Sequence, residues 1–287
     1  MAQRFIAGLI QPNAGDEMGR NIDFVIDQAK SAQARGAQFI LTPENVSMMT
    51  YGRANLAAKA FIEREHPALA AFRDLARDLK VWFLAGSLHV KPDVAGSDDR
   101  LANRSYLIDA QGGIVARYDK IHMFDVDLKG GESYRESAAF RPGEQAVLAQ
   151  TPWGVVGLTI CYDLRFAYLY RALAHEGAHM LTIPSAFTKP TGEAHWHVLQ
   201  RARAIENGCY VLAPAQCGVH ANNRKTFGHS LVVAPWGEVL ADAGAEPGFI
   251  TAEIDLVKVE EARAMVPSLR HDRVFTAPKR LRVEAAE

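Results

Sequence analysis

The amino-acid sequence predicts a layered α/β fold with a mixed sheet. Short apolar runs typical of buried strands alternate with stretches in which apolar residues recur at helical spacing. Residues 104–110 and 113–120 also flank Gln111-Gly112-Gly113, a sequence typical of a hairpin turn. Interleaved strands and helices favour parallel strand pairs, and hairpins add antiparallel ones. Together they predict helices packed on a mixed sheet.

The first half of the chain follows this pattern in order. Residues 4–11 form an apolar run, and residues 21–34 place Ile22, Val25 and Ile26 on one face of a helix. Gly36 stands at a helix-stop position before the next apolar run. The predicted order is strand 4–11, helix 21–34, strand 37–44, helix 68–79, strand 81–90 and then the hairpin.

The second half repeats the cycle. The predicted elements are strand 155–163, helix 166–175, strand 179–187, helix 194–206 and strand 209–217. Residues 230–241 and 249–255 are interpreted as a closing antiparallel pair. No Pro/Gly/Ser-rich linker divides the chain, so we predict a single domain over residues 1–287, with a tail from about residue 262. The connection over residues 124–143 is longer than most and is expected to carry function.

Composition limits the possible functions. Hydrophobic residues make up 48% of the 287 residues, enough for a large core, and the net charge is −1. Without a basic excess or a run of like charges, neither nucleic acid nor an anionic membrane is an expected partner. The apolar run at residues 5–10 is too short for a signal peptide or a membrane span. Three cysteines do not make a disulfide scaffold, so we predict a cytoplasmic protein.

Three chemically capable residues stand at strand ends. Glu44 and Lys120 end apolar strands, and Cys161 lies where an apolar strand meets a polar segment that becomes a helix. If each residue is considered alone, the ordinary interpretation of Glu44 is a solvated acid, that of Lys120 a surface lysine, and that of Cys161 a buried thiol. Together they supply a nucleophile, a base and a donor for an oxyanion. We expect all three to meet at the carboxyl edge of one sheet.

Several motifs give the chain a family resemblance. The segments TPENVS, YDKIHMFDVDL, GLTICYDLRF, PSAF…TGEAHW and GHSLVVAPWGEVL resemble the nitrilase (carbon–nitrogen hydrolase) superfamily, from residue 4 to about residue 275. This resemblance implies a four-layer αββα sandwich and a catalytic set of Glu44, Lys120 and Cys161. It also implies a second glutamate near the site, which matches Glu136, and a homodimer or larger assembly. No cofactor or metal is expected.

The resemblance also implies a reaction. Glu44 would accept the Cys161 proton, the sulfur would attack a small carboxamide, and Lys120 with the backbone N–H of Tyr162 would stabilise the oxyanion. A thioester would then be hydrolysed, giving an acid and ammonia. The other expected supporting or substrate-positioning residues are Glu136, Ser185, Ala186 and His195.

The expected substrate follows from branch-specific segments. PSAFTKPTGEAHW and RARAIENGCYVLAPAQCG are most similar to amidases that act on deaminated glutathione. The alternatives are an ω-amidase acting on 2-oxoglutaramate, a hydrolase of nitriles or N-carbamoyl compounds, and a non-catalytic binding module. One departure is His197, since that branch commonly carries Glu after AHW.

Rival sites have weaker support in the sequence. HEGAH at residues 175–179 fits H-E-x-x-H, but Gly177 should end the helix and separate the two histidines. A zinc set of Cys209, Cys217, His220 and His229 lacks the tight spacing of structural zinc sites. A thiol–histidine hydrolase is the nearest mechanistic rival, yet no histidine is placed as Glu44 and Lys120 are.

Overall fold

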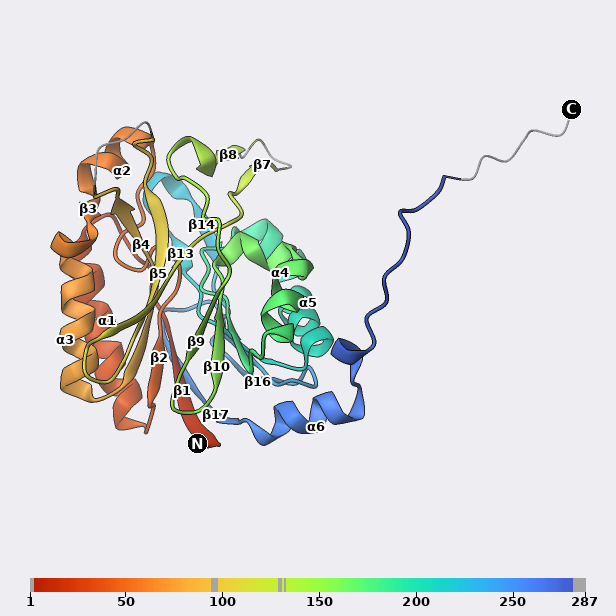
Figure 1. Cartoon of the computed structure of the whole chain (residues 1–287). Coiled ribbons are helices and arrows are strands. Elements are labelled where there is room, and N and C mark those ends of the chain that lie inside the picture. The colour runs from red at the N-terminus through yellow and green to blue at the C-terminus, as the bar shows by residue number, and fades with distance from the viewer. Residues whose placement is uncertain (1–2, 94–97, 129–130, 132, 281–287) are drawn as a thin grey trace, which may run out of the picture.

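Two facing β-sheets with helices on their outer sides make up the body of the protein (Figure 1). The computed structural model describes residues 3–93, 98–128, 131 and 133–280. In Figure 1, α1 and α3 cover one side, α4 and α5 cover the other, and the strands lie between them. The predicted four-layer αββα sandwich with mixed sheets is therefore confirmed.

The first sheet combines parallel and antiparallel pairs. Its strand order is β17-β1-β2-β4-β5-β6, with β3 paired to β4. β1, β2 and β4 are parallel neighbours, whereas β5 and β6 follow as an antiparallel meander. The bounds are β1 (Arg4–Gln11), β2 (Phe39–Leu41), β3 (Phe61–Ile62), β4 (Trp82–Lys91), β5 (Ala102–Ile108), β6 (Ile114–Asp119) and β17 (Gly248–Asp255).

The second sheet repeats this arrangement. Its order is β16-β15-β12-β11-β10-β9, in which β10, β11 and β12 are parallel. The bounds are β9 (Val147–Gln150), β10 (Val155–Leu158), β11 (Met180–Thr182), β12 (Tyr210–Ala213), β15 (Leu231–Val233) and β16 (Val239–Asp242). Two further hairpins pair β7 (Asp125–Asp127) with β8 (Ser133–Arg135) and β13 (Cys217–Val219) with β14 (Lys225–Phe227).

Side-chain alternation along β1 explains the layers. Phe5, Ala7 and Leu9 point into the core between the sheets, while Ile6 and Ile10 pack with the core under the outer helices of the first sheet. Both faces of the central strands β1, β2 and β4 are largely buried, so these strands are mostly apolar. The helices are α1 (Met18–Ala34), α2 (Arg53–Lys59), α3 (Pro67–Leu79), α4 (Ala167–His175), α5 (Lys189–Asn207) and α6 (Val257–Met265).

The structure corrects one sequence-based expectation. The predicted closing pair is wrong: β17 pairs antiparallel with β1, and residues 230–241 instead fold back on themselves as β15 and β16. Near residue 262, where the tail is predicted to begin, α6 continues to Met265 and a 3-10 turn follows at Ser268–Arg270. Residues 271–280 are exposed and lead away from the body (Figure 1). Residues 281–287 lie outside the described part, and the single domain stays a prediction.

Candidate active site

The polarity of the strands brings the three predicted residues together. β2 and β6 run in the same direction within the first sheet, because two antiparallel steps separate β4 from β6. Glu44 and Lys120 therefore follow strands that end at the same edge. Cys161 follows β10 of the second sheet, so the expectation that all three belong to one sheet is wrong. The site lies between two facing sheets.

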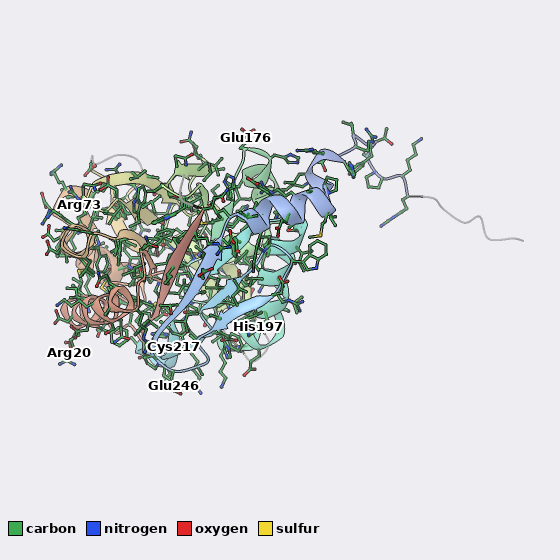
Figure 2. The ribbon with its side chains drawn as sticks, turned by 90° about the horizontal axis from the view of Figure 1, so that it is seen from below. Arg20, Arg73, Glu176, His197, Cys217 and Glu246 are labelled. Carbon is green, nitrogen blue, oxygen red and sulfur yellow. The ribbon has the colours of Figure 1, made fainter. Side chains whose placement is uncertain are left out.

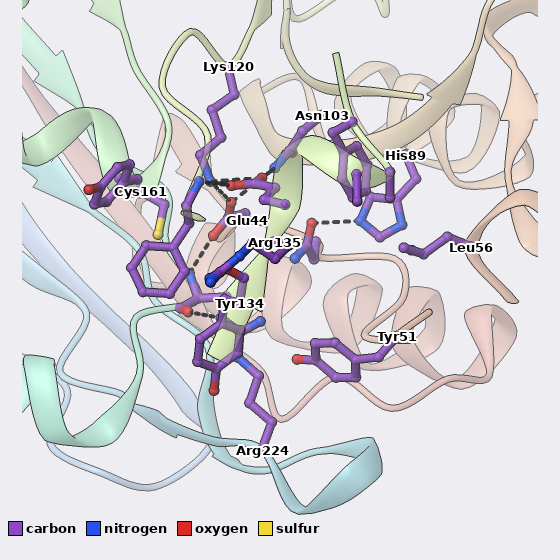
Figure 3. A pocket seen from close by; sticks show the side chains of 18 of the residues that line it. Glu44, Tyr51, Leu56, His89, Asn103, Lys120, Tyr134, Arg135, Cys161 and Arg224 are labelled. Atoms are coloured by element: carbon purple, nitrogen blue, oxygen red, sulfur yellow. Dashed lines mark hydrogen bonds and ion pairs between the residues drawn. The ribbon is translucent and has the colours of Figure 1, made fainter. Parts of the chain in front are cut away.

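A buried ion cluster forms the centre of the site (Figure 3). The Nζ of Lys120 lies 2.8 Å from Oε1 of Glu44, and 2.9 and 2.8 Å from the two carboxylate oxygens of Glu136. Asn103 donates from Nδ2 to Glu44 and to Glu136. Glu136 also accepts the backbone N–H of Phe124, which ties the segment after β6 to the cluster. Glu136, expected near the site, therefore lies within hydrogen-bond distance of Lys120.

Cys161 stands on a sharp turn at the end of β10. Its φ of 49° lies in the left-handed region, which residues with a Cβ rarely adopt. A 3-10 turn, Cys161–Arg165, begins there and leads into α4. The thiol faces Glu44, which acts on it both as a charge and as a hydrogen-bond partner (Figure 3).

Asp163 holds this turn in place through buried hydrogen bonds. It is fully buried, and its carboxylate accepts the hydroxyl of Tyr118 at 2.7 Å and the backbone N–H groups of Ile160 and His122. The ring Nδ1 of His122 also lies 2.7 Å from it. A single acid therefore joins β6 and the segment after it to the turn that carries the nucleophile.

Asp163→Asn is expected to destabilise the protein strongly. The NH₂ group of the asparagine would face groups such as the Tyr118 hydroxyl and the backbone N–H groups, which now donate to the carboxylate. Breaking a buried charged network of this kind costs about 3–5 kcal/mol of stability. Urea unfolding of Asp163→Asn and Asp127→Asn compares this acid with one that pairs with Arg135 at the surface. The Asp127 variant should lose less than about 1 kcal/mol. Equal losses would show that Asp163 is not a structural anchor.

The ion pairs set the protonation state of the site. Burial by itself would raise the pKa of Glu44, but the Lys120 ammonium outweighs it and holds that pKa below the ordinary 4.5. Burial opposes the charge on Lys120, yet the carboxylates of Glu136 and Glu44 raise its pKa above 10.5. Burial and then the Glu44 charge raise the pKa of the Cys161 thiol above 9.0. At neutral pH, the site holds a carboxylate, an ammonium and a neutral thiol that needs a base.

A cavity of about 350 Å³ opens beside the cluster, within the range of small-molecule sites. Opposite the ion cluster lies Arg224, whose guanidinium carbon is 5.3 Å from the Tyr51 ring centre and 5.1 Å from that of Tyr134 (Figure 3). Its Nη2 donates to the carbonyl of Ala186. Among the described residues, its buried Nε and the buried Tyr51 hydroxyl make no hydrogen bond of normal geometry. Both can bind an acceptor atom of a ligand, although the Tyr51 hydroxyl also interacts with the Arg224 guanidinium as a charge and a hydrogen-bond partner.

Only some of the expected supporting residues line this cavity. Tyr162 and Ala186 do, and the Ala186 N–H donates to Glu44 at 2.9 Å. Ser185 is buried and donates to the carbonyl of Ile183 instead. His195 is exposed on α5, where Nδ1 lies 3.3 Å from Arg165. Neither is among the described lining residues, because the helix turns His195 outward and the strand end turns Ser185 inward.

His197 also lies away from the cavity. Its Nε2 is 2.9 Å from Asp242, so its departure from the pattern of the branch leaves the described lining of the site unchanged. The predicted start of the helix at residue 194 is wrong, and so His195 and His197 lie inside the helix: α5 begins at Lys189, with Pro190 in its first turn.

The rival zinc sites do not form. α4 ends at His175, and Gly177 has a φ of 94°, so His179 lies just before β11 rather than on the helix that carries His175. Cys209 precedes β12 of the second sheet and donates to the carbonyl of Ala178, whereas Cys217 begins β13 in a separate two-stranded sheet. The thiol–histidine rival gains no support either, since the group that faces the Cys161 thiol is the carboxylate of Glu44 rather than a histidine.

Comparison with known proteins decides the family. The profile of the family described as carbon-nitrogen hydrolase matches residues 7–264, which include both sheets and every residue of the ion cluster. The chain belongs to the carbon-nitrogen hydrolase family. It is thus an amidase-type enzyme that acts on a small molecule. The resemblance stated from the sequence motifs is confirmed.

Individual relatives agree with this assignment. The deaminated glutathione amidase of Yersinia enterocolitica is 40% identical over 274 residues, which are 94% of this chain and 93% of the relative. The NitFhit protein of C. elegans has a TM-score of 0.88 at 35% identity over 94% of this chain, which spans 65% of that protein. An amidase from Nesterenkonia sp. AN1, seen with acrylamide added at its active site cysteine, has a TM-score of 0.75 at 27% identity over 92% of this chain and 98% of that one.

Proposed function

We propose that this enzyme hydrolyses the amide bond of deaminated glutathione, using Cys161 as nucleophile, Glu44 as base and Lys120 as oxyanion donor. The assignment of the substrate rests on Arg224, a cation that lines the cavity. Its Nε and the nearby Tyr51 hydroxyl make no hydrogen bond of normal geometry among the described residues. In deaminated glutathione the scissile amide joins an acyl group that ends in a 2-oxo acid carboxylate to cysteinylglycine, which ends in a second carboxylate. A carboxylate bound by Arg224 would direct the scissile amide toward the ion cluster. The name of the Yersinia relative supports the same substrate.

In the first half of the proposed reaction, Glu44 takes the Cys161 proton as the sulfur bonds to the amide carbon. The oxyanion is stabilised by Lys120 and by the backbone N–H of Tyr162. Lys120 makes two of its three contacts with Glu136. One N–H can therefore turn to the oxyanion while Glu136 keeps the other. Protonated Glu44 then delivers the proton to the leaving nitrogen, the C–N bond breaks and a thioester remains.

The second half uses the same groups. Glu44 removes a proton from water, the oxygen attacks the thioester carbon, and the C–S bond breaks. Glu44 then returns the proton to the departing sulfur, which restores the neutral thiol. Glu136 does not enter these proton transfers. We assign it to holding Lys120 in place and balancing its charge.

The expected nitrogen product needs correction. A primary amide such as 2-oxoglutaramate would release ammonia, but the amide nitrogen of deaminated glutathione belongs to cysteinylglycine. The amine released is then the dipeptide, and ammonia alone is the wrong readout for this substrate.

A substrate panel with one variant tests the proposal. Product formation is followed from deaminated glutathione, 2-oxoglutaramate, a nitrile and an N-carbamoyl amino acid. For wild type, kcat/KM should be highest for deaminated glutathione. Arg224→Met should raise KM for it by about 10-fold or more and change kcat less, because a hydrogen bond to a charged group contributes about 1.5–3 kcal/mol. The neighbouring exposed Lys225→Met is the matched control.

Each outcome separates the alternatives. Preference for 2-oxoglutaramate would favour an ω-amidase. Turnover of only the nitrile or only the carbamoyl compound would favour a hydrolase of that class of compound instead. An unchanged KM in Arg224→Met, with its Tm preserved, would contradict carboxylate recognition by Arg224. No turnover of any compound would favour a non-catalytic module.

Assembly and location are proposed separately. Met265, Val266, Val274 and Phe275 are exposed around the tail, which supports a homodimer or larger homo-oligomer formed there. Among the helices of the described residues, none has the length and hydrophobicity of a membrane span. A cytoplasmic location stays a prediction from cysteine usage.

A further inference from the structure

A second cluster of metal-ligating side chains lies on the surface, apart from the cavity. His197 comes from α5, His229 from the turn before β15, and Asp242 from the end of β16. Nε2 of His197 is 2.9 Å from one carboxylate oxygen of Asp242, and Nδ1 of His229 is 2.9 Å from the other. These donor atoms all lie within 4.8 Å of one another. None of the three is among the described residues that line the Cys161 cavity.

We propose that these three residues bind a divalent transition-metal ion of the zinc type. Two imidazoles and one carboxylate form a donor set that Zn²⁺ takes at about 2.0–2.2 Å. Ligand atoms around one tetrahedral Zn²⁺ stand about 3.3–3.6 Å apart. The two 2.9 Å His–Asp separations are somewhat shorter than this, and no separation in the cluster exceeds 4.8 Å. Small side-chain shifts would therefore bring all three to it. The side chains of His197, His229 and Asp242 are 37%, 27% and 31% exposed, so water can complete the coordination.

Neighbouring contacts hold the ligands in place. Trp196, fully buried beside His197 on α5, donates from Nε1 to the carbonyl of His229 at 2.8 Å. The His229 N–H donates to Gly244, whose own N–H donates to Asp242. The ring of Phe227 stacks on that of His229 at 4.3 Å. The backbone on which the ligands stand is therefore fixed before an ion arrives, as in protein sites whose outer contacts orient the ligands.

The position of the cluster indicates what the ion would do. It joins the outer helix α5 to the β15–β16 hairpin at the edge of the second sheet, and Figure 2 places His197 at the periphery of the molecule. With protein ligands from three separate segments, the ion would cross-link them. It stabilises only the folded state, because the unfolded chain does not hold these residues together.

The test uses the full chain without a histidine tag, in a Cys161→Ala background so that the catalytic thiol cannot bind the ion. After chelator treatment and dialysis, Zn²⁺ is titrated by calorimetry and Co²⁺ by visible absorption. We expect one Zn²⁺ per chain, d–d bands from Co²⁺, and a Tm raised by about 4 °C or more at saturating Zn²⁺.

Variants decide whether these residues are the ligands. His229→Asn removes the imidazole and suits the left-handed φ of 56°, and Asp242→Asn keeps the shape of the carboxylate. Each should weaken Zn²⁺ binding by about 10-fold or more. His195→Ala, an exposed histidine on the same helix, should bind as tightly as the parent. Absence of tight binding in the parent, or equal binding in all variants, would overturn the proposal and leave a metal-free hydrogen-bond cluster.

Discussion

Cys161→Ala is expected to lose amidase turnover, with kcat lowered about 10⁴-fold or more. The thiol is the proposed nucleophile, and Glu44 and Lys120 of the ion cluster act on it. Without it, no acyl group can pass to the enzyme. The remaining groups do not replace the thiol as a nucleophile, because Glu44 and Lys120 form an ion pair with each other at 2.8 Å. Steady-state kinetics with deaminated glutathione measure the loss.

Cys209→Ala is the matched control for this variant. Cys209 is also buried, but it donates to the backbone carbonyl of Ala178, between α4 and β11, rather than facing a carboxylate. It should keep the wild-type kcat. Full activity in Cys161→Ala would contradict the nucleophile assignment, and equal loss in both variants would indicate a general effect of removing buried thiols.

Glu44→Gln should give the second large effect, a fall in kcat of about 10²–10⁴-fold. The amide keeps the shape of the side chain but cannot accept the thiol proton, and the thiol pKa is raised, so little thiolate forms without a base. Lys120 keeps its contacts with Glu136, and the buried ammonium therefore retains a partner. KM should change less than kcat.

The pH dependence of kcat in the wild-type enzyme tests the protonation state of Glu44. Since Lys120 holds the pKa of Glu44 below 4.5, Glu44 stays ionised as the pH falls toward that value, and the loss of kcat from its protonation should come only below it. Glu63→Gln removes another ion-paired carboxylate, bound to Arg104 and Arg117 outside the cavity. That variant should keep wild-type kcat. A Glu44→Gln enzyme as active as Glu63→Gln would contradict the base assignment.

Much of the fold could be predicted because its signals are local. The apolar run over residues 4–11 and the helical spacing after it need no knowledge of distant contacts. The partner of a strand does need it: nothing near residues 249–255 says that they pair with β1, at the other end of the chain. The start of α5 was predicted too late because Gly192 and Pro190 were not expected inside a helix, although Pro suits a first turn.

The same distinction applies to the site. Glu44, Lys120 and Cys161 stand at strand ends, which sequence patterns reveal. Asn103 could have been found as well, because the hairpin pairs Arg104 with Asp119 and so sets Asn103 opposite Lys120.

No sequence pattern marks Arg224 as a residue of the site. It reaches the cavity from a turn between β13 and β14, and its meaning depends on Tyr51, far away in the sequence. The direction of a side chain is also beyond pattern reading, which is why Ser185 and His195 were expected in the cavity and are not among its described lining residues.

The most direct test of the central claim is partitioning of the acyl-enzyme between water and an added amine. Deaminated glutathione and 2-oxoglutaramate share one acyl group and differ in the leaving amine. Wild-type enzyme is given each substrate with a fixed concentration of glycinamide, and the ratio of glycinamide conjugate to free acid is measured. A thioester on Cys161 predicts the same ratio from both substrates, with no conjugate from Cys161→Ala. Ratios that depend on the leaving amine, or conjugate formed by Cys161→Ala, would contradict a common covalent intermediate.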